Sequence, residues 1–286
     1  MAYSWSGAGT AELLDEQGWL EIFSGLGTLI AEAVVPLLGT AAGREEHGRG
    51  EGGDRTLELD RRAEQVVLAE LEKLCGAGER FSVLSEEAGL LEFGAPFPRV
   101  LLDPVDGSLN AQRGLPVVGT MLCLVAGPTL GEAQVGYVQN LVSGERWHTI
   151  RGGGVHRNGQ RLRPFPAGNR DRIEVLGLES GPRNLLAAQA LIERAGKVRL
   201  LGSMALSLAH TAAGGIDVHC SPITARCLDL AASALMIAEV GGLVTDLDGE
   251  PLARLPADLT GRSTILASAS PELHQVARDL LRGGRD

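Results

Sequence analysis

Two aspartates three positions apart, Asp103 and Asp106, are the side chains whose spacing most plainly allows chemistry. They lie in the segment LLDPVDGS, residues 101–108, where the intervening proline disfavours helical geometry and predicts the end of a strand. Gly107 permits a sharp turn, and Ser108 is expected to cap a short helix. Both carboxylates would then face one pocket beside exposed helix amides, which are suited to bind a phosphate.

Carboxylates packed this closely raise one another's pKa unless a cation lies between them. Oxygen ligands without histidine or cysteine favour Mg²⁺ or Mn²⁺. A pair of solvated aspartates in a turn is the competing interpretation, and the segment alone supports both equally.

Three further acidic features lie near the expected ends of elements. They are Glu86 and Glu87 after an apolar run, Asp60 and Glu64 one helical turn apart, and Asp229 at the start of an apolar helix. Each has an ordinary alternative: a solvated loop for the first pair, a helix surface for the second, and a helix cap for the aspartate. Their common position at element ends is what favours a shared site.

The expected elements would carry these acids into position. Apolar spacing over residues 11–38 predicts a helix, and a second helix is expected to begin at Thr56 or Asp60. Residues 39–53, rich in glycine and charge, indicate a loop that either closes over the site or serves as a connector. Short apolar runs then predict strands over residues 81–84, 100–102, 117–125, 132–138 and 145–150.

The chain changes character after a turn-rich stretch at residues 164–171. Strands are then expected at 173–179, 197–201, 216–220 and 242–246, and helices at 182–195, 203–214 and 227–240. This alternation predicts a second, α/β half. We therefore divide the chain near residue 165 into an N-terminal α+β half, 1–165, with most of the acids, and a C-terminal half, 166–286, with Asp229.

The composition disfavours several classes of function. The 286 residues carry a net charge of −10 and no dense lysine or arginine block, which disfavours a nucleic-acid polymer as partner. Apolar stretches are short of the roughly 20 residues needed to cross a bilayer, and no basic segment precedes one at the N-terminus. We expect a cytoplasmic protein without a membrane partner, whose four cysteines, lacking C-x-x-C spacing, are reduced and mostly buried.

The order of these motifs resembles the inositol monophosphatase family of magnesium-dependent, lithium-sensitive phosphatases. The resemblance covers residues 54 to 250 or so, most of the chain. It rests on Asp60-x-x-x-Glu64, Ser85-Glu86-Glu87, Asp103-Pro-Val-Asp-Gly-Ser-Leu-Asn110, Gly202-Ser203-Met204-Ala205, and Asp229-Leu-Ala-Ala232 with Glu239-Val-Gly-Gly242. The pattern D-P-x-D-G-[ST]-x-N is highly specific, and its match in order with the others favours common descent over chance.

The resemblance implies a five-layer αβαβα sandwich, often homodimeric, with two or three Mg²⁺ ions, or Mn²⁺ in their place, between the halves. The implied ligands of the first metal are Glu86, Asp103 and the carbonyl of Val105. Asp103, Asp106 and Asp229 would hold the second metal, and Asp60 with Glu86 a weaker third.

The implied reaction is hydrolysis of a small phosphate ester by direct attack of metal-bound water. Ser108 and Asp60 would orient and help deprotonate the water, and Glu86 belongs to the same catalytic group. The remaining implied contacts are the amides of Gly107 and Ser108 with the phosphate, and Gly202, Ser203, Arg226 and Asp229 with the substrate.

Two departures concern the substrate. Inositol-specific members carry Trp before the second-motif aspartate and Glu seven residues before it, whereas this chain has Leu228 and Pro222. The form Asp106-Gly-Ser-x-Asn110 followed by Gly114-Leu115-Pro116, together with Arg226-x-x-Asp229, resembles the archaeal-type members, which hydrolyse inositol monophosphates and fructose-1,6-bisphosphate. Arg226 could bind a distal phosphate or pair with the acids, and we favour pairing.

The expected activity is hydrolysis of small phosphorylated polyols or sugars. One alternative is a 3′-phosphatase of adenosine 3′,5′-bisphosphate, although aromatic residues make up only 3% of the chain and would leave an adenine platform hard to build. An alternative of another class is a non-catalytic regulator that binds metal or phosphate. Retention of every acidic ligand disfavours the regulator.

Overall fold

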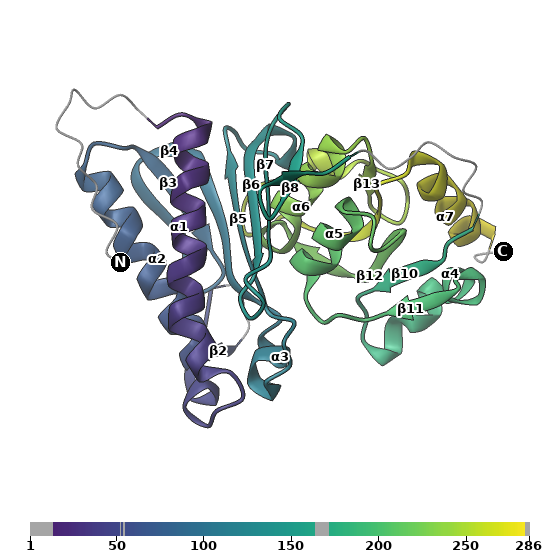
Figure 1. The fold of residues 1–286 in the computed structure, drawn as a ribbon, viewed down its shortest axis with the longest axis horizontal. Coiled ribbons are helices and arrows are strands. Elements are labelled where there is room, and N and C mark those ends of the chain that lie inside the picture. Colours follow the sequence, from purple (N-terminus) through teal and green to yellow (C-terminus); the bar gives the residue numbers. More distant parts are fainter. Residues whose placement is uncertain (1–13, 52, 54, 164–171, 284–286) are drawn as a thin grey trace.

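The computed structural model describes residues 14–51, 53, 55–163 and 172–283. Its layers run across the molecule in Figure 1 as two helices, a sheet, two helices, a second sheet and two more helices. The outer helices are α1 (Glu16–Val34) and α2 (Glu58–Gly76), the central ones α5 (Met204–Ala212) and α6 (Cys227–Glu239), and the far ones α4 (Gln189–Arg194) and α7 (Pro271–Gly283). The predicted five-layer αβαβα sandwich is confirmed.

Helix α1 begins after Asp15, whose carboxylate accepts a hydrogen bond from the Gly18 amide at 2.8 Å. By length and composition alone, the segment Glu16–Leu37 is apolar enough to cross a membrane. Its buried stripe, which includes Phe23 and Ile30, packs on α2 and the first sheet in the manner of a core helix.

The segment between α1 and α2 is more ordered than its glycine content indicates. A short 3-10 turn, Ala42–Arg44, precedes strand β1 (Glu46–Arg49), which pairs antiparallel with β2 (Arg55–Leu57). The second helix begins at Glu58, between the two starts that the sequence suggested. The loop is therefore folded back on the start of α2.

The first sheet has seven strands in the order β3-β4-β5-β6-β7-β8-β9. They are β3 (Phe81–Ser85), β4 (Gly89–Asp106), β5 (Gly119–Val125), β6 (Ala133–Asn140), β7 (Arg146–Ile150), β8 (Val155–Arg157) and β9 (Gln160–Arg161). Strand β4 pairs with β3 twice: Val83 lies opposite Leu91 in an antiparallel arm and opposite Val100 in a parallel arm. The prediction missed the first arm because its residues alternate between exposed and partly buried and do not form an apolar run.

The second sheet has the order β11-β10-β12-β14-β13. Its strands are β10 (Val175–Leu178), β11 (Lys197–Arg199), β12 (Val218–Arg226), β13 (Leu243–Thr245) and β14 (Arg262–Ser268). The predicted helix at 182–195 is a 3-10 helix, Pro182–Ala188, followed by α4. The predicted boundary near residue 165 lies outside the described residues.

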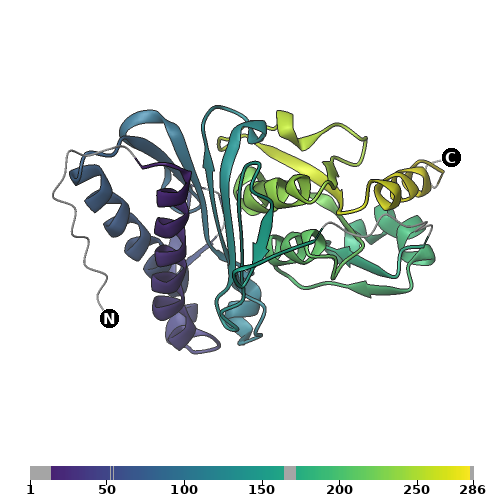
Figure 2. The ribbon, with the colours of Figure 1, turned by 45° about the horizontal axis from the view of Figure 1, so that its top comes forward.

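Three apolar cores join the layers. One packs α1 and α2 on the first sheet, one packs α5 and α6 between the sheets, and one packs α4 and α7 on the second sheet. All four cysteines are free thiols, and all but the partly buried Cys75 are buried, as predicted. Because α5 and α6 contact both sheets, the two sheets are joined through these helices (Figure 2).

Candidate active site

Asp103 lies near the end of β4, in the extended geometry that the following proline predicts. Its side chain is 2% exposed, and its Oδ1 accepts a hydrogen bond from the Val105 amide at 3.1 Å. Burial raises the pKa of Asp103 well above its usual value, and the charges of Glu86, Asp106 and Asp229 add to the increase. A cation bound close to such a carboxylate would stabilise its ionised form.

Asp106 faces the start of α5 and joins the two halves. Its carboxylate accepts hydrogen bonds from the hydroxyl of Ser203 and from the amides of Met204 at 3.1 Å and Ala205 at 2.8 Å. Burial, together with the charge of Asp229, raises its pKa to about 7 against these hydrogen bonds. The hydroxyl of Ser203, predicted as a substrate contact, thus donates its hydrogen bond to Asp106.

Gly107 makes the turn from β4 into helix α3 (Ser108–Arg113) possible. Its φ is +95°, and an added Cβ would lie 2.9 Å from the Gly202 carbonyl oxygen. Asn110 closes the turn against the other half, because its amide nitrogen donates to the carbonyls of Val117 and Leu201, each at 2.8 Å. The turn is therefore fixed by contacts from both halves.

Ser108 is the first residue of α3 and not its cap, so the predicted capping role is wrong; Gly107 occupies the cap position. The Ser108 hydroxyl lies 3.1 Å from the carbonyl oxygen of Val105 and 3.4 Å from Asp60 Oδ1. It can donate its single proton to one of them at a time. The Val105 carbonyl is the nearer acceptor, and Asp60 is the alternative one.

Asp60 is the third residue of α2, and its Oδ2 accepts a hydrogen bond from the Leu57 amide at 3.0 Å. Burial raises the pKa of Asp60 to about 8; the Leu57 amide opposes the increase, and Glu87 and Glu86 add to it. One carboxylate oxygen of Asp60 thus accepts from the backbone at the start of α2, while the other lies near the Ser108 hydroxyl.

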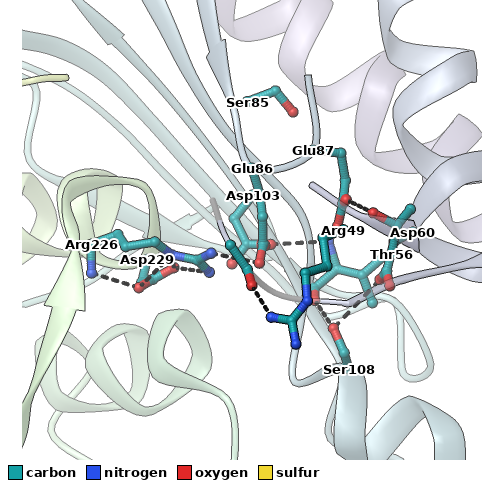
Figure 3. A network of polar contacts seen from close by, with 12 residues as sticks. Arg49, Thr56, Asp60, Ser85, Glu86, Glu87, Asp103, Ser108, Arg226 and Asp229 are labelled. Carbon is teal, nitrogen blue, oxygen red and sulfur yellow. Dashed lines mark hydrogen bonds and ion pairs between the residues drawn. The ribbon is translucent and has the colours of Figure 1, made fainter. Parts of the chain in front are cut away.

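Arg226 connects Glu86 and Asp229, as Figure 3 shows. Its Nη1 lies 2.6 Å from Glu86 Oε1 and its Nη2 lies 2.9 Å from Asp229 Oδ1. Asp229, the third residue of α6, also accepts from the Arg226 amide at 2.7 Å, so it is a helix cap as well. The ion-pair interpretation of Arg226 agrees with this geometry.

The other two predicted acids take part in local structure. Glu64 accepts hydrogen bonds from the Ser85 hydroxyl and, at 3.0 Å, from the Ala88 amide. Glu87 accepts a hydrogen bond from Thr56 of β2, just before α2, and burial raises the pKa of Glu87. The carbonyl of Glu87 also accepts from the Glu51 amide at 3.0 Å. The loop before α2 is thus attached next to the Glu86 side of the site.

The donor chemistry fits a hard divalent cation. The four acids of the inner site, Glu86, Asp103, Asp106 and Asp229, offer only carboxylate oxygens, and burial and mutual repulsion raise the pKa values of the two central ones. Among the described residues, however, no three acidic, histidine or cysteine side chains group closely enough to hold an ion as they stand. The guanidinium of Arg226 occupies the position between Glu86 and Asp229.

A pocket of about 190 Å³ opens beside these acids. It is lined by Asp106, Arg226 and Asp229, by Gly202, and by Glu179, which the sequence reasoning missed. The missed signal was available: Glu179 is the last residue of the predicted strand 173–179, and Glu86 comes shortly after the predicted strand 81–84. The prediction applied that rule to one sheet only.

A five-layer fold with carboxylates from both halves beside one pocket is the arrangement of a metal-dependent phosphatase. The family model described as the Inositol monophosphatase family matches residues 16–282. The chain belongs to the inositol monophosphatase family, and it is a phosphoric monoester hydrolase.

Individual relatives agree with this assignment. A fructose-1,6-bisphosphatase/inositol-1-monophosphatase of Archaeoglobus fulgidus is 34% identical over 82% of this chain and 87% of its own. A bifunctional NADP phosphatase/NAD kinase of Methanococcus maripaludis is 27% identical over 87% of this chain, which spans only 47% of that protein. The solved structure of a Thermotoga maritima IMPase, 21% identical, superposes with a TM-score of 0.77 over 93% of this chain and 98% of its own.

Proposed function

We propose that the chain is a Mg²⁺-dependent hydrolase of small phosphorylated polyols or sugars, working as a cytoplasmic homodimer. The observation that carries the proposal is that three segments bring acids together: Glu86 after β3, Asp103 and Asp106 at the end of β4, and Asp229 at the start of α6. Three helix starts, those of α2, α5 and α6, direct amides at Asp60, Asp106 and Asp229. Fixed dipoles of this kind stabilise ionised groups in a site that lacks bulk water.

Two cations would be held by Glu86, Asp103, Asp106, Asp229 and the carbonyl of Val105. A third would be held by Asp60 and Glu86. Cations held there would neutralise the phosphate and lower the pKa of a nearby water. The amides of Gly107 and Ser108 would bind phosphate oxygens at the start of α3.

Ser108 and Asp60 would handle the proton of the attacking water. The hydroxyl of Ser108 lies 3.4 Å from Asp60 Oδ1, so it can accept from the water while it donates to the aspartate. The pKa of Asp60, about 8 without cations, falls when positive charge is nearby. Asp60 would then be ionised at neutral pH and able to receive the proton.

Inositol monophosphates and fructose-1,6-bisphosphate are the first substrates to test, since the Archaeoglobus fulgidus relative is named for both. The name of the Methanococcus maripaludis relative supports NADP as a second candidate. No aromatic side chain is among the residues that line the described pocket, which disfavours a stacked adenine for NADP and for adenosine 3′,5′-bisphosphate alike.

The test is phosphate release from these four esters and from phenyl phosphate, with Mg²⁺, with Mn²⁺ and with a chelator. We expect turnover with Mg²⁺, weaker turnover with Mn²⁺ and none with chelator. Turnover that persists in chelator would contradict the proposal. Sedimentation analysis of the same sample tests the dimer.

A further inference from the structure

Glu179 is a carboxylate that lines the pocket but has no role in the proposed hydrolysis. It follows β10 directly, and its amide donates to the Cys220 carbonyl at 3.1 Å, which extends the parallel pairing of β10 with β12. The carboxyl ends of parallel strands are where ligands bind in α/β sheets. The backbone at Glu179 is thus fixed at the edge that faces the pocket.

The side chain of Glu179 is incompletely hydrogen-bonded. Burial raises its pKa, while a hydrogen bond from the Gly202 amide acts in the opposite direction. Its Oε2 is shielded from solvent and has no hydrogen-bond partner among the described residues. Buried acceptors are rarely left this way, because the lost hydration is not replaced. The orphaned oxygen belongs to a residue that lines the pocket shared with Asp106 and Asp229.

The rest of the pocket supplies little else that could recognise a hydroxyl group. Of the β12 residues that line the pocket, Ile223 and Ala225 are apolar, and Thr224 is the only polar side chain besides Arg226. The guanidinium of Arg226 is already bound to Glu86 and Asp229. A neutral hydroxyl donor therefore suits the pocket better than a second anionic phosphate does.

We propose that Glu179 is a specificity residue that accepts a hydrogen bond from a hydroxyl of a polyol monophosphate and disfavours esters with a second phosphate. This inference rests on the proposed function, since it concerns the part of the substrate beyond the reacting phosphate. It assigns the substrate class to phosphorylated polyols in preference to sugar bisphosphates.

The experiment compares kcat and KM of the wild type, Glu179→Gln and Glu179→Ala with Mg²⁺. The substrates are inositol-1-phosphate, fructose-1,6-bisphosphate and phenyl phosphate, which has no hydroxyl beyond its phosphate. Glu174→Gln is the matched control, because Glu174 is an exposed acid just before β10 and outside the pocket lining. It tests the loss of one negative charge without the loss of the pocket contact.

We expect Glu179→Ala to raise KM for inositol-1-phosphate about 10- to 100-fold, the range for a lost hydrogen bond to a charged group. Its kcat/KM for phenyl phosphate should stay within about twofold of the wild type, a split that a merely structural role would not produce. Glu179→Gln should improve kcat/KM for fructose-1,6-bisphosphate about tenfold, by removing charge repulsion.

Equal losses with inositol-1-phosphate and phenyl phosphate would overturn the inference, and so would unchanged KM values. A wild type that prefers fructose-1,6-bisphosphate to inositol-1-phosphate would also overturn it. A wild type that hydrolyses none of the three esters with Mg²⁺ would instead refute the proposed function, so the two failures are distinguishable. Thermal unfolding of each variant identifies any loss that comes from misfolding.

Discussion

Arg226→Met tests the electrostatics of the site most directly. The guanidinium makes two short contacts, 2.6 Å to Glu86 and 2.9 Å to Asp229, and all three side chains are about 15% exposed or less. Removing one partner of a buried ion pair costs about 3–5 kcal/mol, because the remaining charges lose their compensation. Two charge-assisted hydrogen bonds at about 1.5–3 kcal/mol each give a similar sum.

The expected result has two parts. In chelator, Arg226→Met should lower Tm by about 10 °C, at roughly 2–4 °C for each kcal/mol in a chain of this size. With Mg²⁺, the variant should recover most of this loss and bind the cation about 10- to 100-fold more tightly, since the cation no longer competes with the guanidinium. Differential scanning calorimetry and titration calorimetry measure the two parts.

Arg254→Met is the control, because Arg254 makes an exposed ion pair with Glu250 at 3.2 Å. Exposed pairs contribute about 0–1 kcal/mol, so Tm and Mg²⁺ affinity should hardly change. If Arg226→Met matches this control in both measurements, the reasoning is refuted. If Mg²⁺ instead binds more weakly, Arg226 orders the ligands and does not compete with the cation.

Three further changes test other parts of the structure. Asp103→Asn should weaken Mg²⁺ binding and lower turnover about 1000-fold, as measured by titration calorimetry and phosphate release; wild-type values would contradict its assignment as a ligand. Gly107→Ala should destabilise the chain by about 1–3 kcal/mol more than Gly159→Ala in urea unfolding, because both have positive φ but only the first Cβ meets a carbonyl oxygen, at 2.9 Å. Burial lowers the pKa of His219 to about 4, so the unfolded chain binds more protons between about pH 6.5 and 4, and stability should fall by about 3 kcal/mol as the pH falls through that window. His219→Leu should remove this loss in unfolding curves across the same pH range, and an unchanged loss would assign it to other groups.

The sequence predicted the acids of the site better than their partners. The backbone conformation at Asp103 and Asp106 could be predicted from neighbouring residues, since proline keeps the strand extended and glycine makes the turn. Local rules do not reach the Ser203 hydroxyl, which meets Asp106 from almost a hundred residues away. The capping prediction for Ser108 was wrong for a local reason: Gly107, whose φ is positive, occupies the cap position, so α3 begins at Ser108.

The amino-acid sequence by itself determined the family and most of the helices and strands, because these depend on motifs within short segments and on periodicity. Only the tertiary structure decided that Arg226 pairs with Glu86, that helix starts stabilise three of the acids, and that Glu179 shares the pocket. These contacts join residues that are far apart in the chain. The packing of α5 and α6 between the two sheets brings these residues together. A pattern within a short segment carries no information about which distant segment will pack against it.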